Sequence, residues 1–332
     1  MIETDPRDII GQQDESDFEL DTRRHLDRYR ESAPELSRLI GDEFVAAHAL
    51  TYRRYDEEAK LSRRDYFRWM RRTNVGVFLT SVSSATAMAW SLWFAGQPGS
   101  PLAEGAQVFS ILAVVGAALG SVGLYILREG KLLETWMRKR AMAETHRIDY
   151  FETVLKRAVE DGGRTVALAL EYFRRYQFEV QRNYYHYRAR QHENSARRTL
   201  WIGAAGALLA AVSTSTGVFL DDNWRWLGAV SVLGAALGAF AIGREQMTQD
   251  RRNAERYDRT YSALLAQAGM LKQIRSAVGQ GRDDVVLTFA AAVNEQVSNE
   301  HRQWLEQADA AKRAIQEIER TLGPGRLGNA DG

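Results

Sequence analysis

Residues 71–94, RRTNVGVFLTSVSSATAMAWSLWF, decide the fold, and residues 197–220, RRTLWIGAAGALLAAVSTSTGVFL, repeat their pattern. Each stretch begins Arg-Arg-Thr and continues for about twenty residues without a charged side chain. At a rise of about 1.5 Å per helical residue, such a run is long enough to cross the hydrocarbon core of a bilayer, which is about 30 Å thick. The sequence therefore predicts membrane-spanning helices over 75–94 and 200–220.

A second uncharged run follows each of these after a short loop, over 108–127 and over 226–242. The two second runs share the pentapeptide GAALG, at 116–120 and 234–238. A duplicated two-helix membrane hairpin accounts for all four runs. The alternative is four buried helices of a soluble bundle, which is disfavoured because helices of soluble proteins rarely extend this far without a charge.

The basic residues predict how these hairpins are oriented. Four segments flanking the apolar runs contain 24 Lys and Arg residues, whereas the two hairpin loops, 95–107 and 221–225, contain only Arg225. Cytoplasmic loops carry such an excess of basic residues, so both termini and the central segment are predicted to be cytoplasmic. The 24 residues are those of segments 53–73, 128–147, 182–198 and 244–260.

Outside the membrane, the absence of glycine and proline predicts long helices over 42–75 and 164–198, each entering a span. Two further helices are expected to continue out of the second and fourth spans, from Arg128 to Glu160 and from Arg244 to Val278. Glycine turns at 162–163 and 279–281 are expected to end them. Residues 1–17 are expected to be a mobile acidic tail because they hold little apolar surface. The predicted parts are a mostly disordered acidic region (1–34), a first helix-hairpin-helix repeat (35–160), a second repeat (161–278), a C-terminal cytoplasmic helix (279–322) and a disordered tail (323–332).

The predicted fold class is thus an all-α membrane protein with four transmembrane helices arranged as two tandem hairpins. Their long cytoplasmic extensions are expected to form a helical bundle. Because four slender helices enclose little space, a conduit would require a homo-oligomer.

Small and hydroxyl-bearing residues within the spans suggest packing and pore-lining roles. Glycine lets helix backbones approach closely in a membrane, and the residues expected to serve this purpose are Gly116, Gly120, Gly203, Gly234 and Gly238. Hydroxyls could line a pore, or they could bond back to their own helix or join neighbouring helices. The candidate pore-lining residues are Thr80, Ser83, Ser84, Ser213 and Thr216.

The sequence offers no catalytic motif and no cofactor signature. Hydrolase, phosphate-loop and dinucleotide fingerprints are missing from it, and without cysteine there is no thiolate metal site or cysteine nucleophile. The six histidines are scattered, so no metal site is predicted. No charged side chain lies within a predicted span, which argues against a proton-coupled transporter or a voltage sensor.

The stretch from Tyr172 to Arg198 combines arginine with tyrosine. Arginine can contact phosphates and tyrosine can stack on bases, so this segment is a candidate nucleotide-binding element. The alternative is a helix whose aromatic residues pack in a bundle and whose arginines satisfy the orientation rule or touch anionic lipid. The candidate nucleotide-binding residues are Arg174, Arg175, Arg182, Tyr184, Tyr185 and Arg188.

The arrangement resembles the bacterial SLATT family of two-span effectors. After the first hairpin, Trp136, Arg140 and Ala143-Glu144 follow the family's Trp-x-x-Arg-x-x-Ala-Glu pattern with altered spacing, and Arg252 and Ala254-Glu255 follow it without the tryptophan. This chain departs from the family by carrying two hairpins. The resemblance implies a bacterial inner-membrane protein of an antiphage system, a partner nucleotidyltransferase and a nucleotide or short oligonucleotide ligand.

Three classes of function follow from these observations. The first is a pore-forming effector, an ion channel that depolarises the membrane when a nucleotide signal opens it. The second is a non-conducting membrane scaffold that recruits a cytoplasmic partner. The third, a membrane-bound enzyme, is disfavoured by the missing motifs.

Overall fold

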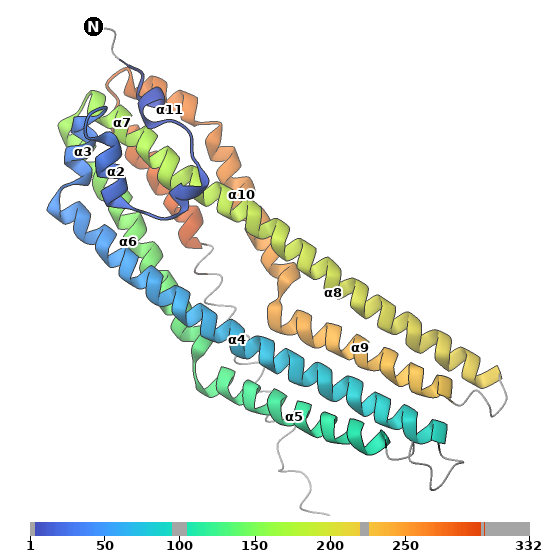
Figure 1. The fold of residues 1–332 in the computed structure, drawn as a ribbon. Helices are drawn as coiled ribbons and strands as arrows, with labels where there is room; N and C mark the ends of the chain where they lie inside the picture. The colour runs from blue at the N-terminus through green and yellow to red at the C-terminus, as the bar shows by residue number, and fades with distance from the viewer. Residues whose placement is uncertain (1–3, 95–104, 220–225, 300–301, 303–332) are drawn as a thin grey trace, which may run out of the picture. The chain divides into compact units, whose positions relative to one another are not determined.

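The computed structural model describes residues 4–94, 105–219, 226–299 and 302. Within these ranges every secondary-structure element is a helix (Figure 1). The prediction of an all-α chain is therefore confirmed. The expected outer loops, apart from residues 105–107, lie outside the described residues, as do the end of the expected C-terminal helix and the tail from 323.

The described helices form two compact units. Unit 1 takes its residues from 1–57, 137–185 and 259–332, and unit 2 from 58–136 and 186–258. Unit 2 contains all four predicted spans. Unit 1 contains the expected cytoplasmic segments nearest the two termini and in the middle of the chain.

Unit 2 is built from two helical hairpins. The first pairs the end of α4 (Glu43–Phe94) with α5 (Gly105–Glu129), and the second pairs the end of α8 (Val180–Phe219) with α9 (Trp226–Thr248) (Figure 1). Phe78 and Phe240 join the two hairpins through rings whose centroids are 5.0 Å apart.

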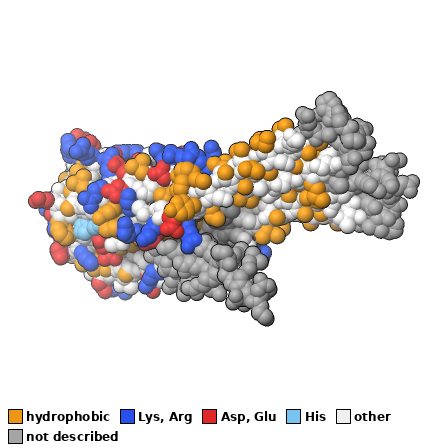
Figure 2. Space-filling view, turned by 90° about the horizontal axis from the view of Figure 1, so that it is seen from below, with side chains coloured by type: hydrophobic (Ala, Val, Ile, Leu, Met, Phe, Trp, Pro, Cys, Tyr) orange, Lys and Arg blue, Asp and Glu red, His pale blue; other side chains and the backbone are white. Residues whose placement is uncertain are grey.

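Among the described residues, one helix is long and apolar enough to cross a membrane by length and composition. This is α5, with a mean hydropathy of 2.1 over its most apolar window, of which 22% is buried. A core helix of a soluble protein would be mostly buried, whereas α5 exposes Val108, Ile111 and Val114. Figure 2 shows hydrophobic and uncharged side chains over the hairpins of unit 2 and charged side chains gathered over unit 1.

Close glycine contacts hold each hairpin together. A Cβ atom added to Gly116 would lie 2.7 Å from the backbone nitrogen of Thr80, and one added to Gly234 would lie 2.5 Å from that of Ala210. The facing helices supply glycines that the sequence analysis did not select, Gly76 and Gly206. The two hairpins therefore use equivalent backbone contacts, as expected for a duplication.

The other selected glycines are less tightly packed. A Cβ on Gly120 would make ordinary contacts at 3.5 Å or more, and one on Gly203 would meet the Cβ of Ala241 at 3.3 Å. A Cβ on Gly238 would meet nothing within 4 Å. Gly234 and Gly238 thus differ sharply in how closely the facing helix approaches them, although they belong to the same pentapeptide.

Several hydroxyl groups in unit 2 donate to the carbonyl four residues earlier on their own helix. The Thr80 hydroxyl donates to the Gly76 carbonyl at 2.9 Å and approaches the Ala113 carbonyl of α5 at 3.4 Å. Ser83 and Ser213 are buried and Ser84 is exposed. The side chain of Thr216 lies outside the described part of the structure.

The helices that leave the hairpins are interrupted, which corrects the expected continuous helices after the second and fourth spans. α5 ends before α6 (Leu132–Asp161), and α9 ends before α10 (Asp250–Ala268). The residues at the breaks, Lys131 and Gln249, both have left-handed backbones, with φ of 46° and 48°. Their carbonyls accept the first backbone bonds of the next helices, so the chain turns without losing the helical bonding.

Unit 1 is a bundle around a core of aromatic side chains. Its remaining elements are α7 (Arg164–Phe173), a π-helix (Arg174–Glu179), α11 (Leu271–Val278) and a helix over 284–299. Gly162 and Gly163, at φ of 72° and 59°, form the turn between α6 and α7 that the sequence predicted. The fully buried aromatic residues include Tyr29, Tyr150, Phe151, Tyr172, Phe173, Tyr176 and Phe178.

The N-terminal region is ordered, contrary to the expected mobile tail. It forms α1 (Pro6–Ile10), a 3₁₀ turn (Glu15–Phe18), α2 (Thr22–Tyr29) and α3 (Pro34–Ile40). Asp5 caps α1, whose first residue is a proline, a combination that favours helix initiation. The segment is held because a few of its side chains are deeply buried, including Ile10 and Asp17, and not because it is apolar on average.

Candidate anion-binding site

The π-helix at Arg174–Glu179 is the element on which the site is built. One turn of wider helix interrupts what would otherwise be a continuous helix from α7 into α8. Such interruptions are frequent at functional sites, because they free backbone groups and change the direction of side chains. Here the Arg147 guanidinium donates to the backbone carbonyl of Tyr176 at 2.8 Å and to the side chain of Gln177 at 2.7 Å.

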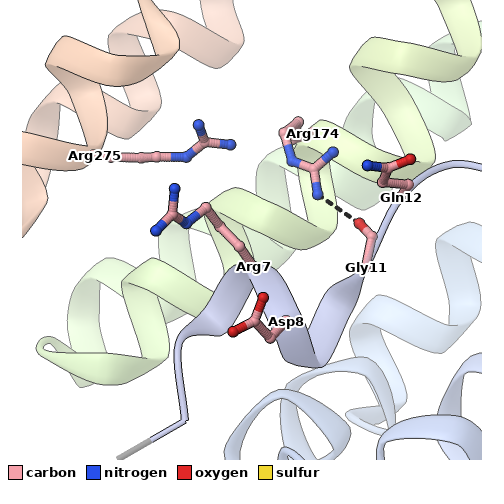
Figure 3. Close-up of a pocket in the computed structure, with 6 residues that line it drawn as sticks. All are labelled: Arg7, Asp8, Gly11, Gln12, Arg174 and Arg275. Carbon is pink, nitrogen blue, oxygen red and sulfur yellow. Dashed lines mark hydrogen bonds between the residues drawn. The ribbon is translucent and has the colours of Figure 1, made fainter.

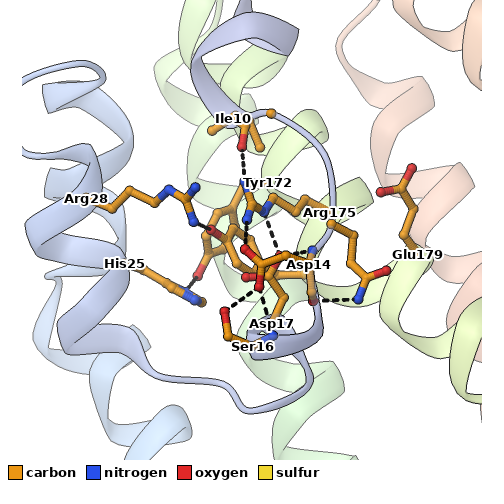
Figure 4. Close-up of polar contacts among 12 residues, drawn as sticks. Ile10, Asp14, Ser16, Asp17, His25, Arg28, Tyr172, Arg175 and Glu179 are labelled. Carbon is orange, nitrogen blue, oxygen red and sulfur yellow. Dashed lines mark hydrogen bonds and ion pairs between the residues drawn. The ribbon is translucent and has the colours of Figure 1, made fainter.

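Arg175 is fully engaged inside unit 1. Its Nε donates to Asp17 Oδ2 at 2.7 Å, and Asp17 is itself buried (Figure 4). The two terminal nitrogens of Arg175 donate to the Ile10 carbonyl at 2.6 Å and to Asp14 at 3.0 Å. Burial lowers the pKa of Arg175, whereas the hydrogen bond to Asp17 raises it. The net pKa of Arg175 lies above its usual value. This arginine holds the N-terminal region on the π-helix.

Arg174 has carboxylates on two sides and a carbonyl on a third. Its Nε donates to Glu171 at 2.5 Å, and its terminal nitrogens reach Glu179 at 2.8 Å and the Gly11 carbonyl at 2.6 Å. Glu171 also accepts two bonds from Arg275 of α11, at 2.5 and 3.1 Å. Burial lowers the pKa of Arg174, but Glu171 and Glu179 outweigh it and raise the pKa overall.

A hollow of about 420 Å³ lies where these elements meet. Figure 3 shows the guanidinium groups of Arg7 and Arg275 turned toward the same opening, with Arg174 beyond it. Arg7 is well exposed and bonds to Asp5, whose pKa it lowers to about 2. The lining residues are Arg7, Asp8, Gly11, Gln12, Arg174 and Arg275. All three guanidinium groups are paired with carboxylates, those of Asp5, Glu171 and Glu179, so an anionic ligand would have to displace one of these partners. Guanidinium geometry matches phosphate.

A chain of buried aromatic hydroxyls lies beside Arg175. His25 Nδ1 is 2.6 Å from the Tyr172 hydroxyl, which lies 2.8 Å from that of Tyr150 (Figure 4). Burial raises the pKa of both tyrosines. Burial also lowers the pKa of His25 to about 3, an effect that Asp21 opposes and the nearby arginines reinforce. His25 is therefore neutral in the folded protein at physiological pH.

Because the pKa of His25 is lowered in the folded protein, we expect the protein to lose stability in mild acid. The unfolded chain binds a proton near the ordinary histidine pKa of about 6.5, whereas the folded chain does not until about pH 3. Stability therefore falls as the pH drops through this window, by about 2 kcal/mol between pH 6.5 and pH 5. Thermal unfolding at pH 7 and pH 5 measures this, and H25Q should be less stable at pH 7 but lose less on acidification. An equal loss in both proteins would exclude His25 as the cause.

The six arginines and tyrosines selected from the sequence do not form one surface. Of these, only Arg174 lines the hollow. Tyr185 is buried, and Arg188 bonds to Gln191 at 2.6 Å on its own helix. Arg182 lies over the ring of Phe178, and Tyr184 lies under the guanidinium of Arg140.

Sequence reasoning missed Arg7, Gln12 and Arg275. Arg7 and Gln12 fall in a region that composition placed among disordered segments, and Arg275 lies on a short helix with no motif. A usable signal was present in the proline of α1 preceded by a capping aspartate and followed by two isoleucines.

One family model matches part of this chain. Residues 173–304 match the family model for SMODS and SLOG-associating 2TM effector domain 1. The match covers the π-helix, the second hairpin, α10, α11 and the helix over 284–299. It confirms the SLATT resemblance over this part of the chain, which is less than half of its length. No curated protein and no solved structure matches the chain.

Proposed function

We propose that this protein is a pore-forming effector of the bacterial inner membrane that acts in antiphage defence, where a nucleotide signal opens it and the membrane depolarises. The observation that carries the proposal is the match of residues 173–304 to a two-transmembrane effector domain associated with nucleotide signalling. That domain is described as an effector rather than a catalyst, and no catalytic group is required of this chain.

The proposed architecture has four spans, with two hairpins side by side in the membrane and both termini in the cytoplasm. Two features support it: the equivalent glycine contacts of the hairpins and the exposed apolar side chains of unit 2. The concentration of basic residues on one side of the hairpins supports the orientation. Oligomers of this unit would enclose the conduit.

The absence of cysteine makes the orientation directly testable. Single cysteines at Thr145 and Glu255, which are both exposed, should react with a membrane-permeant maleimide and resist an impermeant one in intact cells. A cysteine at Gly99 should react with both reagents. Strong external labelling at Thr145 or Glu255 would contradict the proposed orientation.

We place the nucleotide at the hollow lined by Arg7, Arg174 and Arg275 rather than along the whole segment from Arg174 to Arg188. A volume of about 420 Å³ lies within the usual range of small-ligand sites. Phosphates arriving here would compete with Glu171 for Arg275 and with Asp5 for Arg7. Arg174 connects the hollow to the π-helix, which continues directly into α8 and the third predicted span. Ligand binding would thereby bias the helix that enters the membrane.

Removing one arginine from the hollow should weaken nucleotide binding by about 10- to 100-fold, the value of one charge-assisted hydrogen bond. R7A and R275A are the informative changes, because neither side chain is deeply buried. R30A is the matched control, since Arg30 is exposed and pairs only with the neighbouring Asp27. Titration of the purified chain with a panel of mono- and dinucleotides, at two salt concentrations, measures this. Equal affinities of R7A, R275A and R30A for every nucleotide that binds would place the ligand elsewhere.

Ion efflux from proteoliposomes tests the function itself. A nucleotide that binds should change the efflux rate, and R275A should reduce the response at limiting nucleotide. Efflux equal to that of protein-free vesicles in every condition would favour the scaffold instead.

A further inference from the structure

A second group of chemistry-bearing side chains lies in unit 1, away from the arginine-lined hollow. His48 comes from α4, and His146 and Asp149 come from α6 at a spacing of three residues. One ligand-type atom from each of the three lies within 4.8 Å of the others. The Nδ1 atoms of His48 and His146 are both 3.9 Å from the same oxygen, Oδ2 of Asp149.

These distances do not correspond to hydrogen bonds, which would bring nitrogen and oxygen to about 2.7–3.2 Å. Three groups able to donate a lone pair therefore converge without bonding one another. Nδ1 of His146 is, moreover, buried and has no hydrogen-bond partner. An unpartnered buried polar atom in such a position needs an explanation, and binding of a metal ion would supply one.

The rings are held in place by their neighbours. Tyr55 stacks on His146 with an interplanar angle of 2° and centroids 5.7 Å apart. Phe44 meets His48 edge-on at 5.1 Å. The three side chains retain between 21% and 41% of their exposure, which leaves an ion a route in and a place for a water ligand.

We propose that His48, His146 and Asp149 bind a divalent transition-metal ion, with zinc as the best match. Two imidazoles and one carboxylate are typical zinc ligands, and water completes the four-coordinate shell. With metal–ligand bonds of about 2.0–2.1 Å, tetrahedral ligands lie about 3.3 Å apart. The two nitrogen–oxygen separations of 3.9 Å, and the separation of the ligand atoms within 4.8 Å of one another, would therefore have to shorten by side-chain rotation when the ion binds. Magnesium is excluded as the preferred ion because it favours oxygen ligands.

The metal would join α4 to α6 within unit 1. α4 continues without interruption into the first predicted span, so the ion would fix the helix that enters the membrane. The role is a structural link between two helices, separate from the nucleotide site, and it does not depend on the proposed pore.

Metal titration of the full-length protein in detergent, purified without a histidine tag, tests the proposal. Zinc should bind with a stoichiometry of one per chain and raise the Tm by about 5–10 °C at 100 times the dissociation constant, whereas magnesium should not. Cobalt bound at the same site should give the absorption spectrum of a tetrahedral ion. H48Q, H146Q and D149N should each lower the zinc affinity at least tenfold.

His192 provides the matched control. It also faces a carboxylate, but it bonds to that of Asp250 directly, at 2.6 Å. Among the described residues it belongs to no group of three potential metal ligands. H192Q should bind zinc like the unchanged protein. The metal-free Tm of each variant shows whether it still folds. The proposal is overturned if the unchanged protein binds no stoichiometric zinc, or if folded H48Q and D149N both bind zinc as tightly as H192Q.

Discussion

Replacing Arg175 by Met should lower the free energy of unfolding by about 3–5 kcal/mol, the largest effect expected of any single side-chain change in unit 1. The substitution leaves Asp17 buried without its partner and removes the donor to the Ile10 carbonyl. An uncompensated buried charge is costly, whereas the intact pair is close to neutral. The N-terminal region should therefore detach before the rest of unit 1 unfolds.

Limited proteolysis and thermal unfolding measure this directly. R175M should be cleaved within residues 11–21 under conditions where the unchanged protein resists. The double variant R175M/D17L should recover much of the lost stability, because it removes the buried charge together with its partner. Full resistance of R175M to cleavage, with an unchanged Tm, would show that Arg175 does not hold this region.

The second large effect is expected within a single pentapeptide of α9. G234A should separate the second hairpin, since the new Cβ would lie 2.5 Å from the backbone nitrogen of Ala210 and 2.6 Å from the Gly206 carbonyl. Backbone atoms cannot move aside as the end of a side chain can. The loss of stability should therefore reach or exceed the roughly 1–3 kcal/mol that is typical of overpacking, which is enough to separate the two helices. G238A, four residues later, should be tolerated because its Cβ would meet nothing within 4 Å.

Disulfide crosslinking between cysteines placed at Thr214 and Ser231, whose hydroxyl oxygens lie 2.8 Å apart, reports on the hairpin, because the chain has no cysteine of its own. The crosslink should form in G238A and in the unchanged background and be lost in G234A. G116A should weaken the first hairpin in the same way. Identical crosslinking in G234A and G238A would contradict the close glycine contact.

Long stretches of sequence without glycine or proline predicted the long helices. The stretch from Asp42 to Val75, without glycine or proline, became part of the unbroken α4, and the Gly162-Gly163 turn lies where it was expected. Gly116 and Gly234 make close backbone contacts with helices that supply Gly76 and Gly206. The sequence analysis did not select these two partners, because packing partners depend on which faces of two helices meet.

Features that depend on a few specific contacts were not predictable. The N-terminal region was judged by its average polarity, yet two buried residues and the Arg175 network hold it in place. The break at Gln249 carries no strong sequence signal, since the left-handed residue there is neither glycine nor asparagine. At Lys131 the preceding Gly130 was a helix-end signal that the sequence analysis did not use. Long separations in sequence hid both sites: Arg7 meets Arg275 only through the fold, and His48 meets His146 in the same way.

The nucleotide hypothesis stays a prediction, and the structure suggests a different set of residues for it. Of the selected residues Arg174 lines the hollow, whereas Arg175 is occupied with Asp17 and Tyr185 is buried. Tyrosine and arginine interleaved on one helix therefore report mainly on the packing of unit 1. The more exposed guanidinium groups of the hollow are those of Arg7 on α1 and Arg275 on α11.

Single-channel recording of the purified full-length chain in planar bilayers tests the central claim most directly. The account predicts unitary currents whose open probability changes when a nucleotide that binds the hollow is added on the side of unit 1. The same nucleotide should have little effect on R7A/R275A channels, whose conductance should be unchanged. Protein that inserts with the expected cysteine accessibility, binds the nucleotide and yet gives no unitary current would contradict the account.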